Sequence, residues 1–286
     1  MAFFRHPVTR YFLIAFAGTW FFQLPMVLGR DGLGLFAYHV PMPTYVGLFL
    51  LSSAVPAVSG AWLTFKLEGR PGLQRFVRRF GQWRVGVAPF LIVTLAYPVL
   101  YLAGYWLTTG HLPVADLVGK WSALFTVYLP ALLIFPALIT WGEEPGWRGF
   151  ALTRLQTEVH PVIASLIVGA LHGVWHLPIF LLVSGPPASG PFNLANFLSN
   201  TGTIMVITVL WSWVFNSAGR SILIAVLLHA SGNATGPLMG RWFGQLPESM
   251  GATMFRLYLG LAVLAIVLTR GRLGNRSDPT PAAAPV

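Results

Sequence analysis

Three short groups of residues in this chain have the types and spacing that catalysis requires. In the first group Glu143 and Glu144 are adjacent, and Arg148 follows Glu144 by four residues, about one helical turn. Adjacent carboxylates repel each other, so they destabilise a fold unless a cation or a shared proton relieves the repulsion. The spacing predicts that Glu144 pairs with Arg148 while Glu143 faces another way. Taken alone, this group indicates no more than an ion pair at a helix end.

Two histidine motifs follow, each with a polar partner four residues away. His172 precedes His176 and His229 precedes Asn233 at this spacing, so each pair shares one face of a helix. A glutamate near a histidine can act as a general base toward water, and a histidine with an asparagine amide can donate hydrogen bonds to an oxyanion. We therefore expect hydrolysis of an acyl bond. Glu143, His176 and His229 would also suit zinc, as a site with two histidines and one carboxylate.

The elements that must position these residues are membrane helices. Of the 286 residues 55% are hydrophobic and only 9% are charged, whereas a soluble domain has about a quarter charged residues. The mean hydropathy is +0.68. This composition excludes a soluble globular or a disordered protein and predicts an all-α polytopic membrane protein. The chain has no cysteine, which excludes disulfides, thiol nucleophiles and thiolate metal sites.

Eight apolar stretches approach the roughly 20 residues that a spanning helix needs. With both termini cytoplasmic, most of the 18 Lys and Arg residues fall on the cytoplasmic side, as the positive-inside rule requires. We expect a multi-pass protein of the plasma (cytoplasmic) membrane, with a single transmembrane domain at 1–270 and a disordered cytoplasmic tail at 271–286. The expected spans are about 9–29, 43–65, 85–107, 121–142, 161–184, 197–215, 220–240 and 251–269.

The net charge of +10 is explained by membrane contact and orientation, not by a nucleic-acid partner. The most basic segment, 66–84, connects two expected spans and should lie against anionic lipid headgroups. The expected partners are membrane lipid and a membrane-associated peptide substrate, and no nucleic acid. The sequence carries no signal for the oligomeric state.

The candidate residues lie on different spans and at different expected depths. At about 1.5 Å per residue, His172 and His176 lie roughly 16–22 Å beyond the start of their helix. Glu143 instead stands at the end of the expected span 121–142. It can meet the histidines only if this span dips or the site opens as a cavity from the inner face. We expect a catalytic cavity between the fourth, fifth and seventh spans.

The other chemistries of intramembrane proteolysis lack their residues in this chain. No His-Glu-x-x-His sequence occurs, so a zincin-type protease is unsupported. No aspartate lies within an expected span, which excludes a paired-aspartate protease. Ser231-Gly232 is not part of a Gly-x-Ser-Gly sequence, so a rhomboid-like serine enzyme is unsupported too. Glu143 and Glu144 begin the only stretch that looks catalytic.

The candidate residues form three motifs that occur in order on successive helices. They are Glu143-Glu144-Pro-Gly-Trp-Arg148, His172-Gly-Val-Trp-His176 and His229-Ala-Ser-Gly-Asn233. In these motifs the chain resembles the CAAX protease and bacteriocin-processing family (CPBP, or Abi) of intramembrane endopeptidases. The family patterns are Glu-Glu-x-x-x-Arg, Phe-x-x-x-His and His-x-x-x-Asn, and the resemblance covers roughly residues 125–240.

The resemblance implies a glutamate-driven hydrolase that requires no metal. Carried over, the family mechanism makes Glu143 the base that activates water, with His176 beside it. His229 and Asn233 would stabilise the tetrahedral oxyanion. Zinc held by Glu143, His176 and His229 stays as the second interpretation, because these side chains are also plausible ligands.

Three further residues are expected to support the site. The resemblance implies that Glu144 and Arg148 hold the local structure. His172 stands where the family has Phe, which adds a polar group to the face of His176. It either assists the chemistry or hydrogen-bonds a neighbouring carbonyl, and we expect a supporting role.

The expected function is cleavage of a peptide bond in a membrane-associated or lipidated peptide, of the CAAX type or the bacteriocin and leader type. An alternative is a non-catalytic bacteriocin-immunity or scaffold protein of the same family, which keeps the pocket for binding. A small proton-coupled transporter would want carboxylates at mid-span and usually repeat symmetry, and neither is visible. The sequence does not encode a preference for a prenyl group or a particular peptide.

Overall fold

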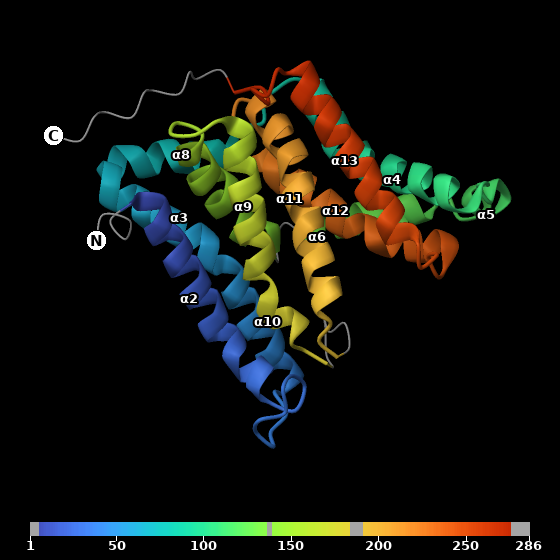
Figure 1. Cartoon of the computed structure of the whole chain (residues 1–286), viewed down its shortest axis with the longest axis horizontal. Helices are drawn as coiled ribbons and strands as arrows, with labels where there is room; N and C mark the ends of the chain where they lie inside the picture. The colour runs from blue at the N-terminus through green and yellow to red at the C-terminus, as the bar shows by residue number, and fades with distance from the viewer. Residues whose placement is uncertain (1–5, 136–138, 184–190, 276–286) are drawn as a thin grey trace.

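The computed structural model describes residues 6–135, 139–183 and 191–275, and every regular element in these ranges is a helix (Figure 1). Among the elements given in the next sentence, η1 is a 3₁₀ helix, whereas η2 and η4 are π-helices. The elements are α2 (Pro7–Leu28), α3 (Met42–Arg78), η1 (Arg79–Gly81), α4 (Val87–Thr109), α5 (Val114–Gly119), η2 (Leu124–Tyr128), α6 (Leu129–Phe135), α7 (Trp141–Glu144), η4 (Pro145–Leu152), α8 (Thr153–Leu155), α9 (Pro161–Trp175), α10 (Leu177–Phe180), α11 (Leu194–Ser217), α12 (Ile222–Phe243) and α13 (Met250–Leu268).

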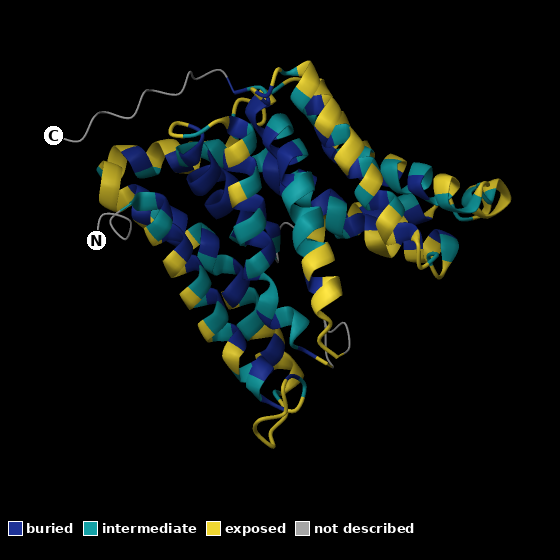
Figure 2. Ribbon diagram, viewed as in Figure 1, coloured by how far each residue is buried: buried dark blue, intermediate teal, exposed yellow. Residues whose placement is uncertain are grey.

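Six of the described helices are long and apolar enough to cross a membrane, namely α2, α3, α4, α11, α12 and α13. Large apolar side chains face outward from them, and Figure 2 shows this exposed face along α13. Val267 of α13 is 66% exposed and Phe21 of α2 is 67% exposed. Such side chains are expected on the outside where lipid, not water, is the solvent. The predicted all-helical polytopic membrane protein is therefore confirmed.

Two of the eight expected spans are not among these six long helices. The expected span 121–142 consists of η2, α6 and α7, and its residues 136–138 lie outside the described part of the chain. The expected span 161–184 consists of α9 and α10. The count of eight stays a prediction, because beside the six long helices the described residues form two shorter apolar helices, Leu124–Phe135 and Pro161–Trp175.

The chain around the paired glutamates packs closely against α3. A Cβ atom on Gly142 would meet the backbone of Ser53, and one on Gly146 would meet the backbone of Pro56. Pro145 begins the π-helix η4 and has no N–H for the preceding turn. π-helical segments of this kind often mark functional sites. The contact brings the ends of α7 and η4 into the interior of the protein.

The most enclosed of the six long helices is α12. Of its most apolar window 61% is buried, against 22–33% for the other five. It carries His229 and Asn233, so the third motif runs through the interior of the helix assembly.

The helices α9 and α11 also approach each other through glycines. A Cβ atom on Gly169 would lie 2.7 Å from Met205 Cα, and one on Gly173 would lie 2.8 Å from Thr201 Cα. Both obstacles are backbone atoms, which cannot turn aside as the end of a flexible side chain can. This contact holds the end of α9, with His172 and the adjoining His176, against α11.

Replacing Gly169 by Ala is expected to destabilise the protein by about 1–3 kcal/mol, because the added methyl group overpacks the contact between α9 and α11. Thermal unfolding of the purified protein in detergent micelles should show a lower Tm. Gly236→Ala in α12 is the matched control, since a Cβ atom there meets nothing within 4 Å. Equal Tm values for the two variants would contradict the close contact.

The chain after α13 turns back onto the end of α11. Asn216 donates from Nδ2 to the carbonyl oxygen of Leu273 over 2.9 Å, and Leu273 is fully buried. Residues 271–275, expected to begin a disordered tail, are therefore packed, because they satisfy polar groups at the end of α11. The rest of the expected tail, 276–286, lies outside the described residues.

Candidate active site

The paired glutamates lie in the interior, where both histidine motifs meet them. Glu143 and Glu144 end α7, and they are 4% and 0% exposed. His172 lies in the last turn of α9 and His176 directly follows that helix. His229 of α12 reaches the same place, with its ring centroid 6.2 Å from that of His172. The structure thus brings together groups that the helical rise placed at different depths.

The predicted ion pair between Glu144 and Arg148 is confirmed, but it is buried. Arg148 donates from Nη1 to Glu144 Oε1 over 2.9 Å and from Nη2 to Thr208 Oγ1 over 3.2 Å. The same Glu144 oxygen lies 2.9 Å from His229 Nδ1. The Arg148 and Glu144 side chains are 1% and 0% exposed. The pair therefore lies in the interior and not at an exposed helix end, because α7 and η4 pack closely against α3.

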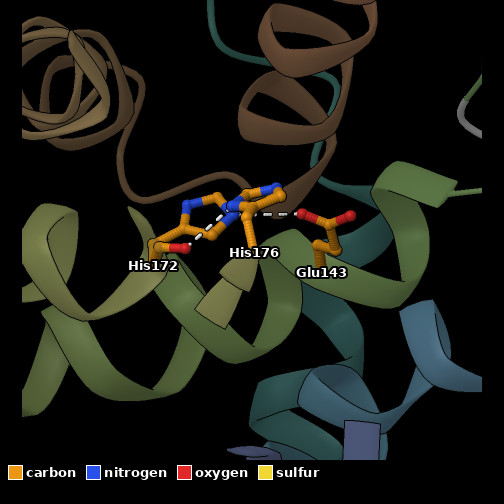
Figure 3. A group of neighbouring side chains, drawn as sticks. All are labelled: Glu143, His172 and His176. Carbon is orange, nitrogen blue, oxygen red and sulfur yellow. Dashed lines mark hydrogen bonds and ion pairs between the residues drawn. The ribbon is translucent and has the colours of Figure 1, made fainter. Parts of the chain in front are cut away.

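The side chain that contacts the Glu143 carboxylate is His172. Its Nε2 lies 3.2 Å from Glu143 Oε2 (Figure 3), and on the other side of the ring Arg148 Nη1 lies 3.4 Å from Nδ1. A guanidinium can only donate, so Nδ1 accepts and the ring proton sits on Nε2, facing Glu143. The ring therefore links Arg148 to Glu143 and does not use these nitrogens to bond a neighbouring carbonyl. His172 is thus in direct contact with the Glu143 carboxylate, and the supporting role expected for it stays a prediction.

The remaining two histidines are both anchored through Nδ1. His176 Nδ1 lies 2.9 Å from the carbonyl oxygen of His172 (Figure 3), and His229 Nδ1 faces the Glu144 carboxylate. Carbonyl and carboxylate oxygens accept hydrogen bonds, so each Nδ1 carries a proton. In the neutral ring this leaves a lone pair on Nε2 of both His176 and His229. Both histidines line a cavity that Glu143 lines as well.

Two hollows flank this set of residues. One cavity, of about 310 Å³, extends toward α4, α11 and α13. The other, of about 170 Å³, extends toward α2 and α3 and reaches Glu143. His176, His229 and Asn233 line both cavities. The expected cavity between the fourth, fifth and seventh spans is therefore also bounded by helices that sequence reasoning did not include.

One set of three side chains in the described part of the chain lies close enough together to hold a metal ion. Glu143, His172 and His176 offer ligand atoms within 4.8 Å of one another. His172 fits poorly, because its Nε2 carries the proton that faces Glu143. The structure groups Glu143 with His172 and His176 and not with His229, so the expected zinc set of Glu143, His176 and His229 stays a prediction. His229 Nδ1 itself lies 4.0 Å from Glu143 Oε2.

Trp211 of α11 is a site residue that sequence reasoning missed. The Arg148 guanidinium lies over its ring at 4.5 Å from the centroid, and the His229 ring centroid is 5.0 Å away. Its indole N–H donates to Tyr97 Oη over 2.7 Å. Trp211 therefore packs against a cation and an imidazole of the site at once. Nothing in the sequence separates it from Trp213, two residues further on.

Comparison with known proteins agrees with the resemblance drawn from the motifs. Residues 121–235 match the family model described as Type II CAAX prenyl endopeptidase Rce1-like. A curated relative, CAAX prenyl protease 2 of Methanococcus maripaludis, is 25% identical over an alignment of 207 residues, and the match covers 68% of this chain and 74% of the relative. The segment matched by the family model contains all three motifs, from Glu143 to Asn233.

Proposed function

We propose, from the premise that this chain belongs to the CAAX protease and bacteriocin-processing family of intramembrane proteases, that Glu143 activates the water that hydrolyses a peptide bond. One observation supports this role above the others. The Glu143 carboxylate is almost completely buried, yet it lines a cavity together with His176, His229 and Asn233. A buried carboxylate on this cavity is therefore surrounded mainly by the side chains that would take part in the reaction.

In the proposed reaction Glu143 takes a proton from water as the water oxygen attacks the peptide carbonyl carbon. The proton on His172 Nε2 faces Glu143 and orients its carboxylate. The tetrahedral intermediate then breaks its C–N bond, and Glu143 gives the proton to the leaving amine. The products are a carboxylic acid and an amine, so the atoms of one water molecule are fully accounted for.

The oxyanion of the intermediate needs hydrogen-bond donors, and His229 and Asn233 are the proposed ones. The Asn233 amide can donate in any state. His229 donates into the cavity when both ring nitrogens carry protons, with Nδ1 still directed at Glu144. The buried ion pair of Glu144 and Arg148 would hold His229 in this orientation.

The proposed substrate is a lipidated or otherwise membrane-associated peptide. The relative in Methanococcus maripaludis is named a CAAX prenyl protease, and the family model is described as a prenyl endopeptidase. A bacteriocin or leader peptide is the alternative within the same family. Both are peptides that would reach the site at the membrane.

A cleavage assay tests this function. The purified full-length protein is reconstituted into liposomes with a quenched fluorogenic peptide that ends in a farnesylated cysteine and three further residues. We expect release of the three-residue end, identified by mass spectrometry, and slower cleavage of the same peptide without the farnesyl group. Failure to cleave either peptide, in a preparation shown to be folded by its thermal transition, would contradict the proposed protease.

Removal of metals is expected to leave the cleavage rate unchanged, because the glutamate mechanism needs no Lewis acid. The reconstituted protein is dialysed against 1,10-phenanthroline and assayed with the same peptide. A loss of cleavage that added Zn²⁺ restores would instead favour the zinc version, in which Glu143, His176 and His229 hold the metal. The anchored Nδ1 atoms of the two histidines are the observation that favours this second candidate.

A further inference from the structure

The end of α3 forms a short basic helix that is set off from the rest of α3. Gly69 interrupts the helical backbone with a φ of 66°, a conformation that favours glycine. Beyond it Gly72 and Phe76 are buried, and the side chains on the opposite face are exposed. We call this outer surface, together with its flanking cations, the basic face. Its exposed cationic residues are Lys66, Arg70, Arg75, Arg78 and Arg84.

Most of these cations have no anionic partner in the part of the chain that the structure describes. Glu68 is the one acidic residue of the segment 66–84, and it is engaged by Arg75 at 2.9 Å and by Arg154 of α8. Arg70 and Arg78, on the outer surface, make no ion pair with a described carboxylate. The basic face therefore presents positive charge that the protein itself does not neutralise.

Aromatic side chains flank the cations. Trp62 is 48% exposed and has Lys66 Nζ at 5.9 Å from its ring centroid. Trp83 is 61% exposed and has the Arg84 guanidinium at 5.1 Å. Exposed tryptophans with neighbouring basic groups are typical of the level where lipid headgroups meet the apolar core of a bilayer. The basic face therefore lies where headgroups are its natural surroundings.

The inner side of the same helix, together with η1 that follows it, is fastened to the π-helix that follows the paired glutamates. Arg79 donates from Nη1 to the carbonyl oxygen of Gly149 and from Nε to that of Arg220, each over 2.9 Å. Phe76 packs so closely on Gly149 that a Cβ atom there would lie 3.2 Å from its ring. Gly149 directly follows Arg148. One helix thus presents cations outward and holds η4 on its inner side.

We propose that the basic face binds anionic phospholipid headgroups, and that lipid bound there steadies η4 and the ion pair at its start. Phosphate groups suit arginine, whose guanidinium donates two parallel hydrogen bonds to phosphate oxygens. We assign a lipid as the ligand because the surface is flanked by exposed tryptophans at the end of a membrane-spanning helix. This binding does not rest on the proposed protease function.

The binding is tested with the full-length protein in nanodiscs of phosphatidylcholine that contain spin-labelled phosphatidylglycerol. We expect the wild-type protein to select phosphatidylglycerol over phosphatidylcholine in electron paramagnetic resonance spectra. Replacing Arg70 and Arg78 by Gln should weaken that selection about tenfold or more, since each basic residue at a membrane surface contributes on the order of a fivefold preference. Equal selection by the wild type and this double variant would overturn the lipid site.

The matched control is a double variant with the same loss of charge elsewhere. Arg241 and Arg256 are exposed residues of α12 and α13, away from the basic face. Replacing both by Gln should leave the lipid selection as it is in the wild type. A loss of selection in the control equal to that of Arg70→Gln with Arg78→Gln would show a general charge effect, and it would overturn a local site.

Hydrogen exchange tests the effect on η4. In wild-type protein, backbone amides of residues 146–152 should exchange more slowly in nanodiscs with phosphatidylglycerol than in phosphatidylcholine alone. In the Arg70→Gln and Arg78→Gln double variant the two lipids should give the same exchange rate. A lipid-independent rate in the wild type would overturn the coupling to η4. None of these measurements requires cleavage, so they stand or fall separately from the proposed function.

Discussion

Replacing Glu143 by Gln should lower the rate of peptide cleavage by about 10²–10⁴-fold, the usual contribution of a general base. A Gln side chain has the same shape but takes no proton from water. Its amide oxygen still accepts the hydrogen bond that His172 Nε2 directs at Glu143 over 3.2 Å. The fold should therefore survive, and kcat should fall while the Tm stays close to that of the wild type. The liposome assay with the farnesylated peptide measures kcat, and thermal unfolding measures the Tm.

A second carboxylate variant provides the control for this experiment. Glu158 lies on the surface, with 45% of its side chain exposed and His6 at 3.0 Å. Glu158→Gln removes the same charge and should cleave as the wild type does. Full cleavage by Glu143→Gln would contradict the proposed role of Glu143. If the chain is instead a non-catalytic immunity protein, Glu143→Ala should retain protection in a survival assay with the bacteriocin.

The features that could be predicted from the sequence depend on contacts within one helix or on overall composition. Runs of apolar residues are sufficient to predict helices such as α4 and α13, because a helix that crosses a bilayer must be long and apolar enough. The pairing of Glu144 with Arg148 needs only the spacing of one helical turn. Each of these predictions rests on physics that acts between near neighbours in the chain.

The burial of the paired glutamates could not be predicted in this way. Hydropathy over 121–142 indicates a spanning helix, whereas the position of Glu143 and Glu144 depends on the close packing of Gly142 and Gly146 against the backbone of α3. That contact joins segments far apart in the sequence. It also decides whether Glu143 lies at a surface or in the interior. The sequence alone could therefore say only that the glutamates reach the histidines if the span dips or the site opens as a cavity.

The hydrogen-bond partner of Glu143 was also beyond the sequence: the resemblance places His176 beside it, whereas His172 contacts the carboxylate in the structure. The two residues share a helix face at a spacing of four, and nothing in that spacing says which ring is nearer. In the structure α9 ends at Trp175, and His176 turns its Nδ1 to the carbonyl oxygen of His172. The ring of His172 is then free to lie between Arg148 and Glu143.

The second large effect is expected at Arg148. Its side chain is 1% exposed and holds Glu144, His172 and Thr208, with the Trp211 ring over the guanidinium. Arg148→Met keeps much of the length and apolar contact but removes the charge. The Glu144 carboxylate then stays buried with only His229 opposite. We expect a loss of about 3–5 kcal/mol in the free energy of unfolding, as for other buried ion pairs that lose one partner.

The cause of that loss can be separated from the loss of packing by a second substitution. Removing both charges, as Arg148→Met with Glu144→Gln, leaves no uncompensated buried carboxylate, and Gln still offers an oxygen to His229 Nδ1. The double variant should therefore be more stable than Arg148→Met alone, because the cost lies in the orphaned charge and not in the missing side chain. Unfolding in mixed micelles measures the stability of the wild type, of both single variants and of the double variant. If the two substitutions act independently, the double variant will be less stable than Arg148→Met by as much as Glu144→Gln alone destabilises the wild type. That result would contradict this account. In that case packing around Trp211, not charge, would be what Arg148 contributes to the site.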